Sequence, residues 1–286
     1  MDMKKIGAAI AAARRKSGLT QDALAERIGV SPQAVSKWEN GRNLPELENL
    51  LQIAEITDAP YSALLEPGKE GQKNALPLRD RLFREENMYA RMQATALEDH
   101  LPETYRALPY MRERHTGQFR KQGKFTSAQV LYINHPLSMA CQAHALGLRD
   151  DALLAAVLLH DVVEDTGVSV DELPFCGEVR ELVRLVSFSV PEGMTKAQAK
   201  EEYFARIAEN GKACLIKLLD RCNNVSTMAG AFSRQKMLDY IEETEKYILP
   251  LANVLKERYL EYGNIAFLLK YHIVSVIETI KYLTME

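Results

Sequence analysis

Apolar residues recur at intervals of three and four along most of the chain, whereas strict alternation of apolar and polar residues is scarce. The first pattern is that of one face of a helix, and the second is that of a half-buried strand. Few runs of β-branched residues occur, and Ala, Leu, Glu and Lys stand at helical spacing. The pattern therefore predicts an all-α protein.

The helical pattern falls into two blocks. Residues 1–66 form a short block and residues 81–286 a longer one, and between them residues 67–80 (PGKEGQKNALPLRD) hold two Gly, two Pro and several charges. Such composition is typical of a linker. A length of 286 residues also allows about two domains, at roughly 100–200 residues each. We therefore expect two helical domains.

The first block carries the start and stop signals of two short, consecutive helices. Thr20 is placed to cap a helix that Gly29 ends, because glycine adopts the left-handed conformation without a Cβ clash. Ser31 is placed to cap the next helix, and Pro32 occupies its first position, where the missing N–H is not needed. Asn40-Gly41 closes this helix. The spacing predicts two short helices joined by a tight turn.

The second of these helices carries residues suited to DNA. With Val35 and Trp38 turned inward, Gln33, Ser36 and Lys37 face outward. Glutamine pairs bidentately with adenine in the major groove, and lysine reaches guanine or a phosphate. Residues 1–44 have a net charge of +4, whereas the whole chain has −3. Basic character is thus concentrated where attraction to phosphate requires it.

The stretch LTQDALAERIGVSPQAVSKWENGRNLPELENLLQIAEI resembles the Cro and phage-repressor (XRE-type) helix-turn-helix family over about residues 3–66. The resemblance implies a five-helix DNA-binding domain. It also implies DNA contacts through Gln21, Gln33, Ser36 and Lys37. Such domains work as dimers on palindromic sites, so we expect a homodimer. The alternative is a helical domain used only for protein contact.

The second block contains a cluster of ionisable residues beside an apolar helix. Residues 152–159 are an unbroken apolar run, which predicts a helix buried on all sides. His160, Asp161, Glu164 and Asp165 lie in its continuation, where His160 and Glu164, and Asp161 and Asp165, are four residues apart. Ionised groups at the end of a buried helix are unfavourable unless they are paired or bound to a metal. The segment therefore predicts a metal platform with acid–base groups one turn further on.

Two further segments supply similar groups. His135 stands just before a predicted helix start at Pro136, and Asp220 lies at the end of another apolar run, residues 214–219. Two histidines and two aspartates from three helices would leave coordination positions open for water and substrate. Such a mixed set suits Mn²⁺, Fe²⁺ or Zn²⁺, and the two carboxylates favour manganese.

The motifs HTGQFRKQG (115–123), YINHPL (132–137), LLHDVVEDTG (158–167) and IKLLDRCNNV (216–225) resemble the HD superfamily of metal-dependent phosphohydrolases. Within it they resemble the hydrolase domain of the RelA/SpoT alarmone enzymes, over about residues 103–258. The resemblance implies an HD-type helical bundle that hydrolyses the 3′-pyrophosphate of guanosine tetra- or pentaphosphate, giving GDP or GTP plus pyrophosphate. It implies His135, His160, Asp161 and Asp220 as ligands of Mn²⁺ or another divalent metal, Glu164 and Asp165 as catalytic groups, and Arg120, Lys121 and Asn224 as substrate-binding residues.

The chain departs from the family pattern in two places. LLDRCNNV stands where the family has a sequence close to LADRLHNM, so Cys222 and Asn223 replace Leu and His. The segment 124–131 is longer than the usual turn. Two alternatives follow: a nucleotide-sensing regulator with an inactive HD domain, or a hydrolase of another nucleotide, such as an adenine alarmone or the 2′-phosphate of NADPH. Residues 259–286 are too few for a synthetase domain, so we expect a hydrolase only.

Composition favours a cytoplasmic protein. The four cysteines contain no CxxC pair, which favours free thiols in a reducing compartment. The N-terminus begins like a signal peptide, but Arg14, Arg15 and Lys16 interrupt its apolar run. The apolar segment 265–285 carries Lys270 and Glu278 among other charges, so it is not expected to span a membrane.

Overall fold

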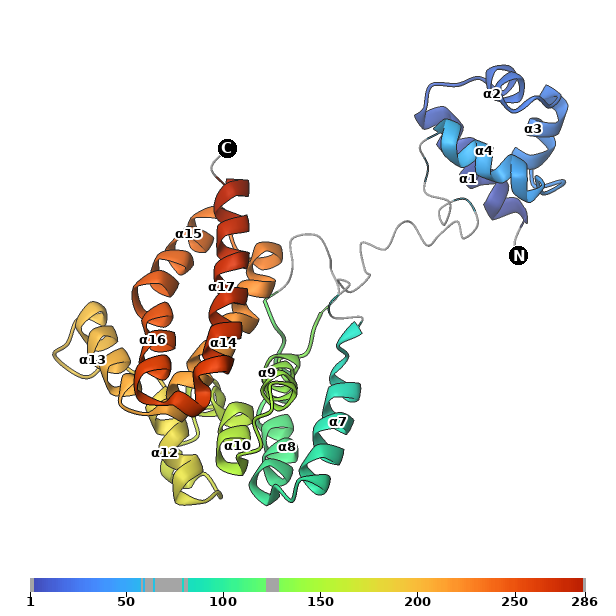
Figure 1. Cartoon of the computed structure of the whole chain (residues 1–286). Helices are drawn as coiled ribbons and strands as arrows, with labels where there is room; N and C mark the ends of the chain where they lie inside the picture. Colours follow the sequence, from blue (N-terminus) through green and yellow to red (C-terminus); the bar gives the residue numbers. More distant parts are fainter. Residues whose placement is uncertain are drawn as a thin grey trace. The chain divides into compact units, whose positions relative to one another are not determined.

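The computed structural model describes residues 3–57, 59, 64, 79, 82–121 and 129–284. It divides into two units, Met1–Ala75 and Leu76–Glu286 (Figure 1). Within the described residues the regular structure is helical, and one isolated antiparallel bridge joins Phe119 to Leu131. The all-α prediction is therefore confirmed. Apart from Arg79, the predicted linker 67–80 lies outside the described residues, and its boundaries stay a prediction.

The N-terminal unit contains α1 (Met3–Lys16), α2 (Gln21–Ile28), α3 (Pro32–Glu39) and α4 (Leu47–Thr57). Thr20 Oγ1 accepts the Ala23 N–H at 3.1 Å, and Gly29 ends α2 with φ 78°. Ser31 caps α3, whose first residue is Pro32, as the sequence predicts. Of the segment in which a fifth helix is expected, only Ala59 and Leu64 belong to the described residues.

An ion pair crosses the N-terminal unit next to its apolar core. Arg14 on α1 is 9% exposed, and its Nε lies 2.6 Å from Glu39 Oε1 at the end of α3. A second bond joins Arg14 Nη2 to Glu39 Oε2 at 2.9 Å. Gly7 lets the two helices approach, because a Cβ there would lie 2.2 Å from the Trp38 carbonyl oxygen. The positions of α1 and α3 are thus fixed by charge and by close backbone contact.

The C-terminal unit is built from helices of 5 to 22 residues. Their bounds are α7 (Glu85–Glu98), α8 (Pro102–Arg114), α9 (Asn134–Ala145), α10 (Asp151–Leu159), α11 (Val162–Thr166), α12 (Gly177–Val186), α13 (Lys196–Ala208), α14 (Gly211–Ala231), α15 (Arg234–Glu243), α16 (Leu249–Arg258) and α17 (Gly263–Thr284). Short helices η1 (Val170–Glu172), η2 (Thr244–Ile248) and η3 (Leu260–Tyr262) lie between them.

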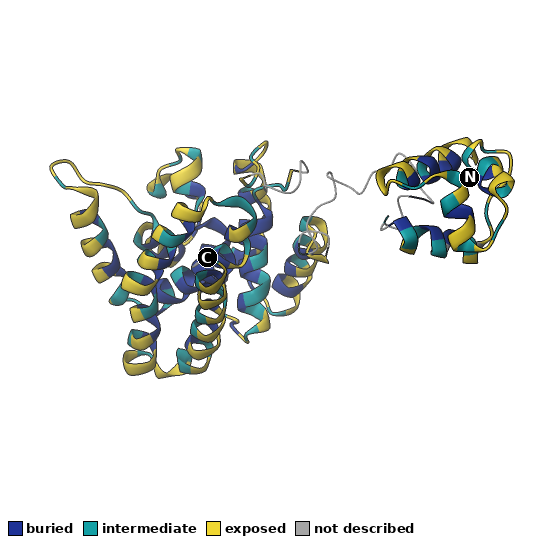
Figure 2. Ribbon diagram, turned by 90° about the horizontal axis from the view of Figure 1, so that it is seen from above, coloured by how far each residue is buried: buried dark blue, intermediate teal, exposed yellow. Residues whose placement is uncertain are grey.

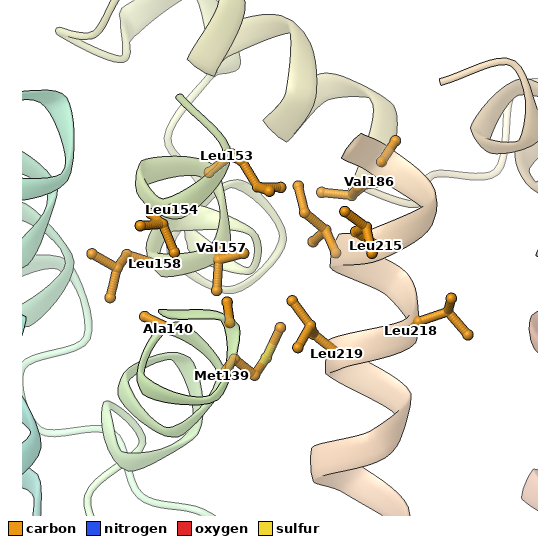
Figure 3. Packing of buried hydrophobic residues seen from close by; sticks show 14 of the residues in the cluster. Met139, Ala140, Leu153, Leu154, Val157, Leu158, Val186, Leu215, Leu218 and Leu219 are labelled. Carbon is orange, nitrogen blue, oxygen red and sulfur yellow. The ribbon is translucent and has the colours of Figure 1, made fainter. Parts of the chain in front are cut away.

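Helix α10 is the centre of the C-terminal core. Every residue from Ala152 to Leu159 is buried, and α10 contacts α8, α9, α12 and α14. Figure 3 shows Met139 and Ala140 of α9, residues of α10, and Leu215 and Leu219 of α14 meeting in this core. Buried positions, dark blue in Figure 2, follow the inward faces of the helices. The helix buried on all sides that the sequence predicts is present.

Two local boundaries differ from the sequence-based prediction. Helix α9 begins at Asn134, so His135 lies in its first turn and not before it. Helix α10 ends at Leu159, the chain turns at His160 and Asp161, and α11 starts at Val162. The continuous helix that was to place His160 and Glu164 on one face is therefore wrong. The turn directs His160 into the interior while Glu164 stays near the surface.

Among the described residues, none of the helices combines the length with the hydropathy that crossing a bilayer requires.

Leu154→Ala should destabilise the C-terminal unit selectively. Leu154 is fully buried, so its truncation should lower the free energy of unfolding by about 2–5 kcal/mol. Trp38 is the chain's one tryptophan and lies in the other core, so its fluorescence should keep its urea midpoint while the CD transition moves. The control, Leu97→Ala at a 60% exposed position of α7, should move neither signal. A shifted Trp38 midpoint would contradict separate cores.

Candidate functional site

Three helices bring the predicted metal ligands together. His135 comes from the first turn of α9, His160 follows the last residue of α10, and Asp220 lies in the middle of α14. One possible ligand atom from each of these side chains lies within 4.8 Å of the others. Asp161 joins them, because its Oδ2 lies 3.0 Å from His160 Nε2 and 3.6 Å from His135 Nε2. The structure thus gathers His135, His160 and Asp220 at one point and places Asp161 beside the two histidines.

Hydrogen bonds on the far side of each ring orient the two histidines. His160 Nδ1 lies 2.8 Å from the Val157 carbonyl oxygen, and His135 Nδ1 lies 2.9 Å from Asn223 Oδ1. Both oxygens only accept, so each Nδ1 carries the proton. In the neutral form of each ring, Nε2 therefore carries the lone pair and faces the cluster, and this is the tautomer that a metal-binding histidine needs.

The residues present fit a divalent cation. His160 Nε2 is buried and makes no hydrogen bond within the described residues, although Asp161 Oδ2 is close. Burial lowers the pKa of His160, but Asp161 and Asp220 outweigh burial and raise that pKa to about 9. The cluster therefore attracts positive charge into a buried place. Two imidazole nitrogens and two carboxylates are a donor set that suits Mn²⁺, Fe²⁺ or Zn²⁺.

Neighbouring polar groups hold the two carboxylates in place. Tyr132 donates to Asp161 Oδ2. Asn224 Nδ2 donates to Asp220 Oδ1 at 2.6 Å, and Lys217 Nζ donates to Asp220 Oδ2 at 3.2 Å. Burial opposes ionisation of Asp220, but Lys217 and His135 hold the pKa of this carboxyl well below its usual value. Both aspartates are thus kept ionised and fixed in direction.

A cavity of about 370 Å³ opens beside this cluster. Five Lys or Arg residues, four Asp or Glu residues and several aromatic rings line it. Its volume lies in the range of small-molecule sites. The lining consists of Phe119, Arg120, Lys121, Tyr132, His135, Asp161, Glu164, Phe188, Lys200, Tyr203, Phe204, Lys217, Asp220, Arg221, Asn224, Phe232, Tyr240 and Glu243.

The predicted basic pair lies at the wall of this cavity. Arg120 follows the bridge residue Phe119, and its backbone N–H donates to the Val130 carbonyl at 2.8 Å. The Arg120 guanidinium donates from Nη2 to Asn224 Oδ1 at 3.2 Å and to Thr227 Oγ1 at 3.3 Å. Lys121 Nζ lies 5.5 Å from the centre of the Phe232 ring. Of the longer segment 124–131, residues 124–128 lie outside the described residues.

The two predicted acid–base residues face different surroundings. The carboxylate of Glu164 lines the cavity, where its Oε1 accepts the Phe188 N–H at 2.7 Å. Partial burial of this group raises the pKa of Glu164. Asp165 is exposed. Burial, Asp161 and Asp165 together raise the pKa of the Tyr132 hydroxyl. Glu164 is therefore the acid that faces the cavity.

On the N-terminal unit, the predicted DNA-contacting residues differ in exposure. Gln33 and Lys37 are exposed on α3, and Ser36 is half-buried. Gln21 is half-buried too, and its Nε2 donates to Glu39 Oε2 at 2.7 Å. Gln33 and Lys37 thus form the most accessible part of the predicted surface.

Comparison with known proteins divides the chain in the same way. Residues 10–64 match the model of the helix-turn-helix family. A 161-residue region, 54% of this chain, is 34% identical to a guanosine-3′,5′-bis(diphosphate) 3′-pyrophosphohydrolase of Aquifex aeolicus and covers 22% of it. A 177-residue region, 59% of the chain, is 32% identical to the bifunctional (p)ppGpp synthase/hydrolase SpoT of Escherichia coli and covers 24% of it.

The chain joins a helix-turn-helix domain to a region homologous to (p)ppGpp hydrolases. It spans less than a quarter of the length of these two relatives. A solved structure described as a metazoan ortholog of SpoT that hydrolyzes ppGpp is 23% identical, with a TM-score of 0.49. That likeness covers 62% of this chain and 94% of the other.

Sequence reasoning missed several residues of the hydrolase-like region. Lys217 stands three residues before Asp220, and Tyr132 stands three residues before His135. This spacing to a predicted metal-binding residue was the sequence feature that could have identified them. Arg221 and Glu243 pair at 2.6 Å on the cavity wall, and Lys200 also bonds Glu243. The sequence gives no signal for Lys200 and Glu243, because their contact joins α13 to the end of α15.

Mn²⁺ should stabilise the C-terminal unit through the histidine–aspartate cluster. A ligand that binds only the folded state, at a hundredfold excess over its Kd, should raise Tm by roughly 5–10 °C. His160→Ala removes one nitrogen donor and should abolish most of this shift in a calorimetric scan. The control is His100→Asn, at an exposed histidine with φ 56°, and it should keep the full shift. Equal shifts in both variants would contradict a metal centre here.

Proposed function

We propose that the C-terminal unit is a metal-dependent phosphohydrolase that converts guanosine tetra- or pentaphosphate into GDP or GTP plus pyrophosphate. The observation that carries this proposal is the cluster of His135, His160, Asp161 and Asp220 at the wall of a basic, aromatic-lined cavity. The sequence similarity to (p)ppGpp hydrolases supports the substrate class.

A divalent ion bound here, Mn²⁺ in our proposal, would lower the pKa of a water molecule and polarise the attacked phosphorus. The reaction breaks the bond between the ribose 3′-oxygen and phosphorus, so the 3′-oxygen must gain a proton and the water must lose one. Glu164 lines the cavity, and burial raises the pKa of its carboxyl group, which favours the protonated form that a general acid needs. We assign the protonation of the 3′-oxygen to Glu164. Asp165 has an indirect role, because its carboxylate lies near the Tyr132 hydroxyl, which donates to Asp161.

The remaining cavity residues bind and orient the nucleotide. Arg120 and Lys121 supply positive charge for the polyphosphate, whereas Lys200 and Lys217 of the same lining are paired with Glu243 and Asp220. A fixed guanidinium suits phosphate because it can form two parallel hydrogen bonds. The rings of Phe232, Phe204 and the neighbouring tyrosines give a purine base flat surfaces to stack on. The Asn224 amide also lines the cavity and reaches Asp220.

We also propose that the N-terminal unit binds DNA with α3 in the major groove. Exposed Gln33 and Lys37 and the net charge of +4 in residues 1–44 support this. In one chain with a hydrolase, this domain either brings the enzyme to DNA or lets nucleotide binding change DNA affinity.

Hydrolysis is tested with ppGpp, Mn²⁺ and detection of released pyrophosphate. We expect turnover by the wild type, and loss of at least a hundredfold in kcat for Glu164→Gln with its Mn²⁺-induced Tm shift retained. The control is Glu178→Gln, an exposed acid of α12, which should keep full activity. If the wild type binds ppGpp but leaves it intact, the C-terminal unit is a nucleotide sensor and the proposed hydrolysis is wrong. A panel with adenine alarmones and NADPH identifies the preferred nucleotide.

The DNA contact is tested with a duplex selected in vitro by the full-length chain. Lys37→Ala should weaken binding and reduce the slope of log K against log salt by about one, because one phosphate contact is lost. Lys196→Ala, at an exposed lysine of the C-terminal unit, should leave the slope unchanged. Repeating the titration with ppGpp tests coupling, and identical affinities would exclude it.

A further inference from the structure

Helix α17 leaves an unusually apolar surface exposed. Phe267, Leu268, Tyr271, Tyr282 and Leu283, which we call the α17 face, are each 51–77% exposed. Together with Leu260 they make up six of the fourteen exposed large hydrophobic residues found among the described residues. Apolar side chains exposed together on one helix mark an interaction site, and the exposed residues between the two ends of the face, Ser275 and Glu278 among them, are polar.

The N-terminal unit has no comparable surface within its described residues. Its exposed large hydrophobic residues there are Met3 and Leu44, which lie on α1 and before α4. A helix-turn-helix protein that binds a palindromic site needs two copies held together. A contact between copies is therefore better supplied by the C-terminal unit.

The α17 face is self-complementary about Ser275. If two α17 helices run antiparallel with Ser275 of each copy at the axis, Leu268 meets Tyr282 on each side of the axis, while Phe267 and Leu283, about 160° apart around the helix, flank the contact. Ser275 itself is small and exposed, so the helices can approach closely at the centre. Identical surfaces that meet in this way are the requirement of a two-fold interface.

A groove of about 350 Å³ lies beside the α17 face, between α16 and α17. Its lining includes Phe267 and Tyr271 of that face, together with Lys256 and Lys270.

We propose that the α17 face is the interface of a homodimer in which two α17 helices pair antiparallel about Ser275. Its five side chains offer on the order of 600 Å² per copy, against roughly 800 Å² per partner in a standard interface. The groove adds to that area. The proposal does not depend on the reaction assigned to the cavity.

Sedimentation of the full chain tests the dimer. The wild type should sediment as a dimer at micromolar concentration, and the double variant Tyr282→Glu, Leu283→Glu as a monomer with unchanged helical CD. Leu97→Glu, an equally exposed apolar position on α7, should stay dimeric. A monomeric wild type, as expected if the N-terminal unit of the same chain covers α17, would overturn the proposal, as would a dimeric double variant.

A disulfide tests the register without breaking the interface. Ser275→Cys should form a covalent dimer under mild oxidation, because the two thiols face each other at the axis. Asn264→Cys, exposed on the same helix but far from the axis, should not. The wild type, which already has the exposed Cys176, is the background control. Equal cross-linking at positions 264 and 275 would overturn the antiparallel pairing.

A second inference concerns Asn223 and rests on the proposed function. Its Oδ1 accepts from His135 Nδ1 at 2.9 Å and from Arg120 Nη1 at 3.1 Å. One buried amide oxygen therefore joins a predicted metal ligand to a predicted phosphate-binding residue. Thr227 contacts Arg120 as well, but no bond between Thr227 and a ligand side chain occurs among the described residues.

We infer that Asn223 is a positioning residue that fixes the His135 ring for the metal and aims Arg120 at the substrate phosphates. Asn223 stands where the family pattern has histidine. A histidine that accepts through one ring nitrogen has one lone pair there, whereas the amide oxygen accepts both donors at once. The substitution thus joins two binding functions at a single atom.

Mn²⁺ affinity, measured by calorimetry with Mn²⁺ alone, separates this role from a structural one. Asn223→Ala should weaken Mn²⁺ binding tenfold or more and also raise the KM for ppGpp. Thr227→Val should raise KM only, with the Mn²⁺ Kd within twofold of wild type. Asn223→Asp keeps the acceptor oxygen and should restore Mn²⁺ binding.

Unchanged Mn²⁺ affinity in Asn223→Ala, or equal weakening in Thr227→Val, would overturn the role of Asn223. Absence of ppGpp turnover in the wild type would instead count against the proposed reaction, while the Mn²⁺ titrations still decide the inference.

Discussion

The C-terminal unit depends on negative charge gathered at the inner end of a fully apolar helix. Asp161 and Asp220 approach His135 and His160 where water is largely excluded, and repulsion between carboxylates there must be offset by positive charge. Lys217 and the raised pKa of His160 supply part of that charge. In the proposed metal site a divalent ion would supply it instead. The electrostatic cost of the cluster would then also be the origin of its affinity for the metal.

The core around α10 makes this arrangement possible. Side chains from α9, α10 and α14 interdigitate in the apolar core. The three segments that carry the predicted metal-binding side chains are therefore held at fixed distances before a metal or nucleotide binds. Three residues of the cluster, His135, Asp161 and Asp220, line the cavity. Half of its basic and aromatic lining residues come from α13, α14 and α15. A rigid cluster with a basic wall beside it is what the proposed hydrolysis of an anionic nucleotide would require.

Features encoded locally could be predicted from the sequence, and features set by long-range contacts could not. Thr20, Gly29 and Ser31 act within their own turns, and the buried run of α10 is visible in its composition. The break at His160 could not be predicted, because it is set by the packing that turns His160 inward. The same holds for Glu243, which reaches Arg221 and Lys200 only after α13, α14 and α15 have come together.

Helix α14 has a mechanical consequence because it is continuous over 21 residues. It carries Asp220 on one side, and at Ser226 it is bonded to His272 of α17 at 2.8 Å. A continuous helix can transmit a tilt along its whole length. In the proposed dimer, a contact on α17 would therefore also act on the helix that carries Asp220, and dimer formation and the proposed hydrolysis would be linked through α14.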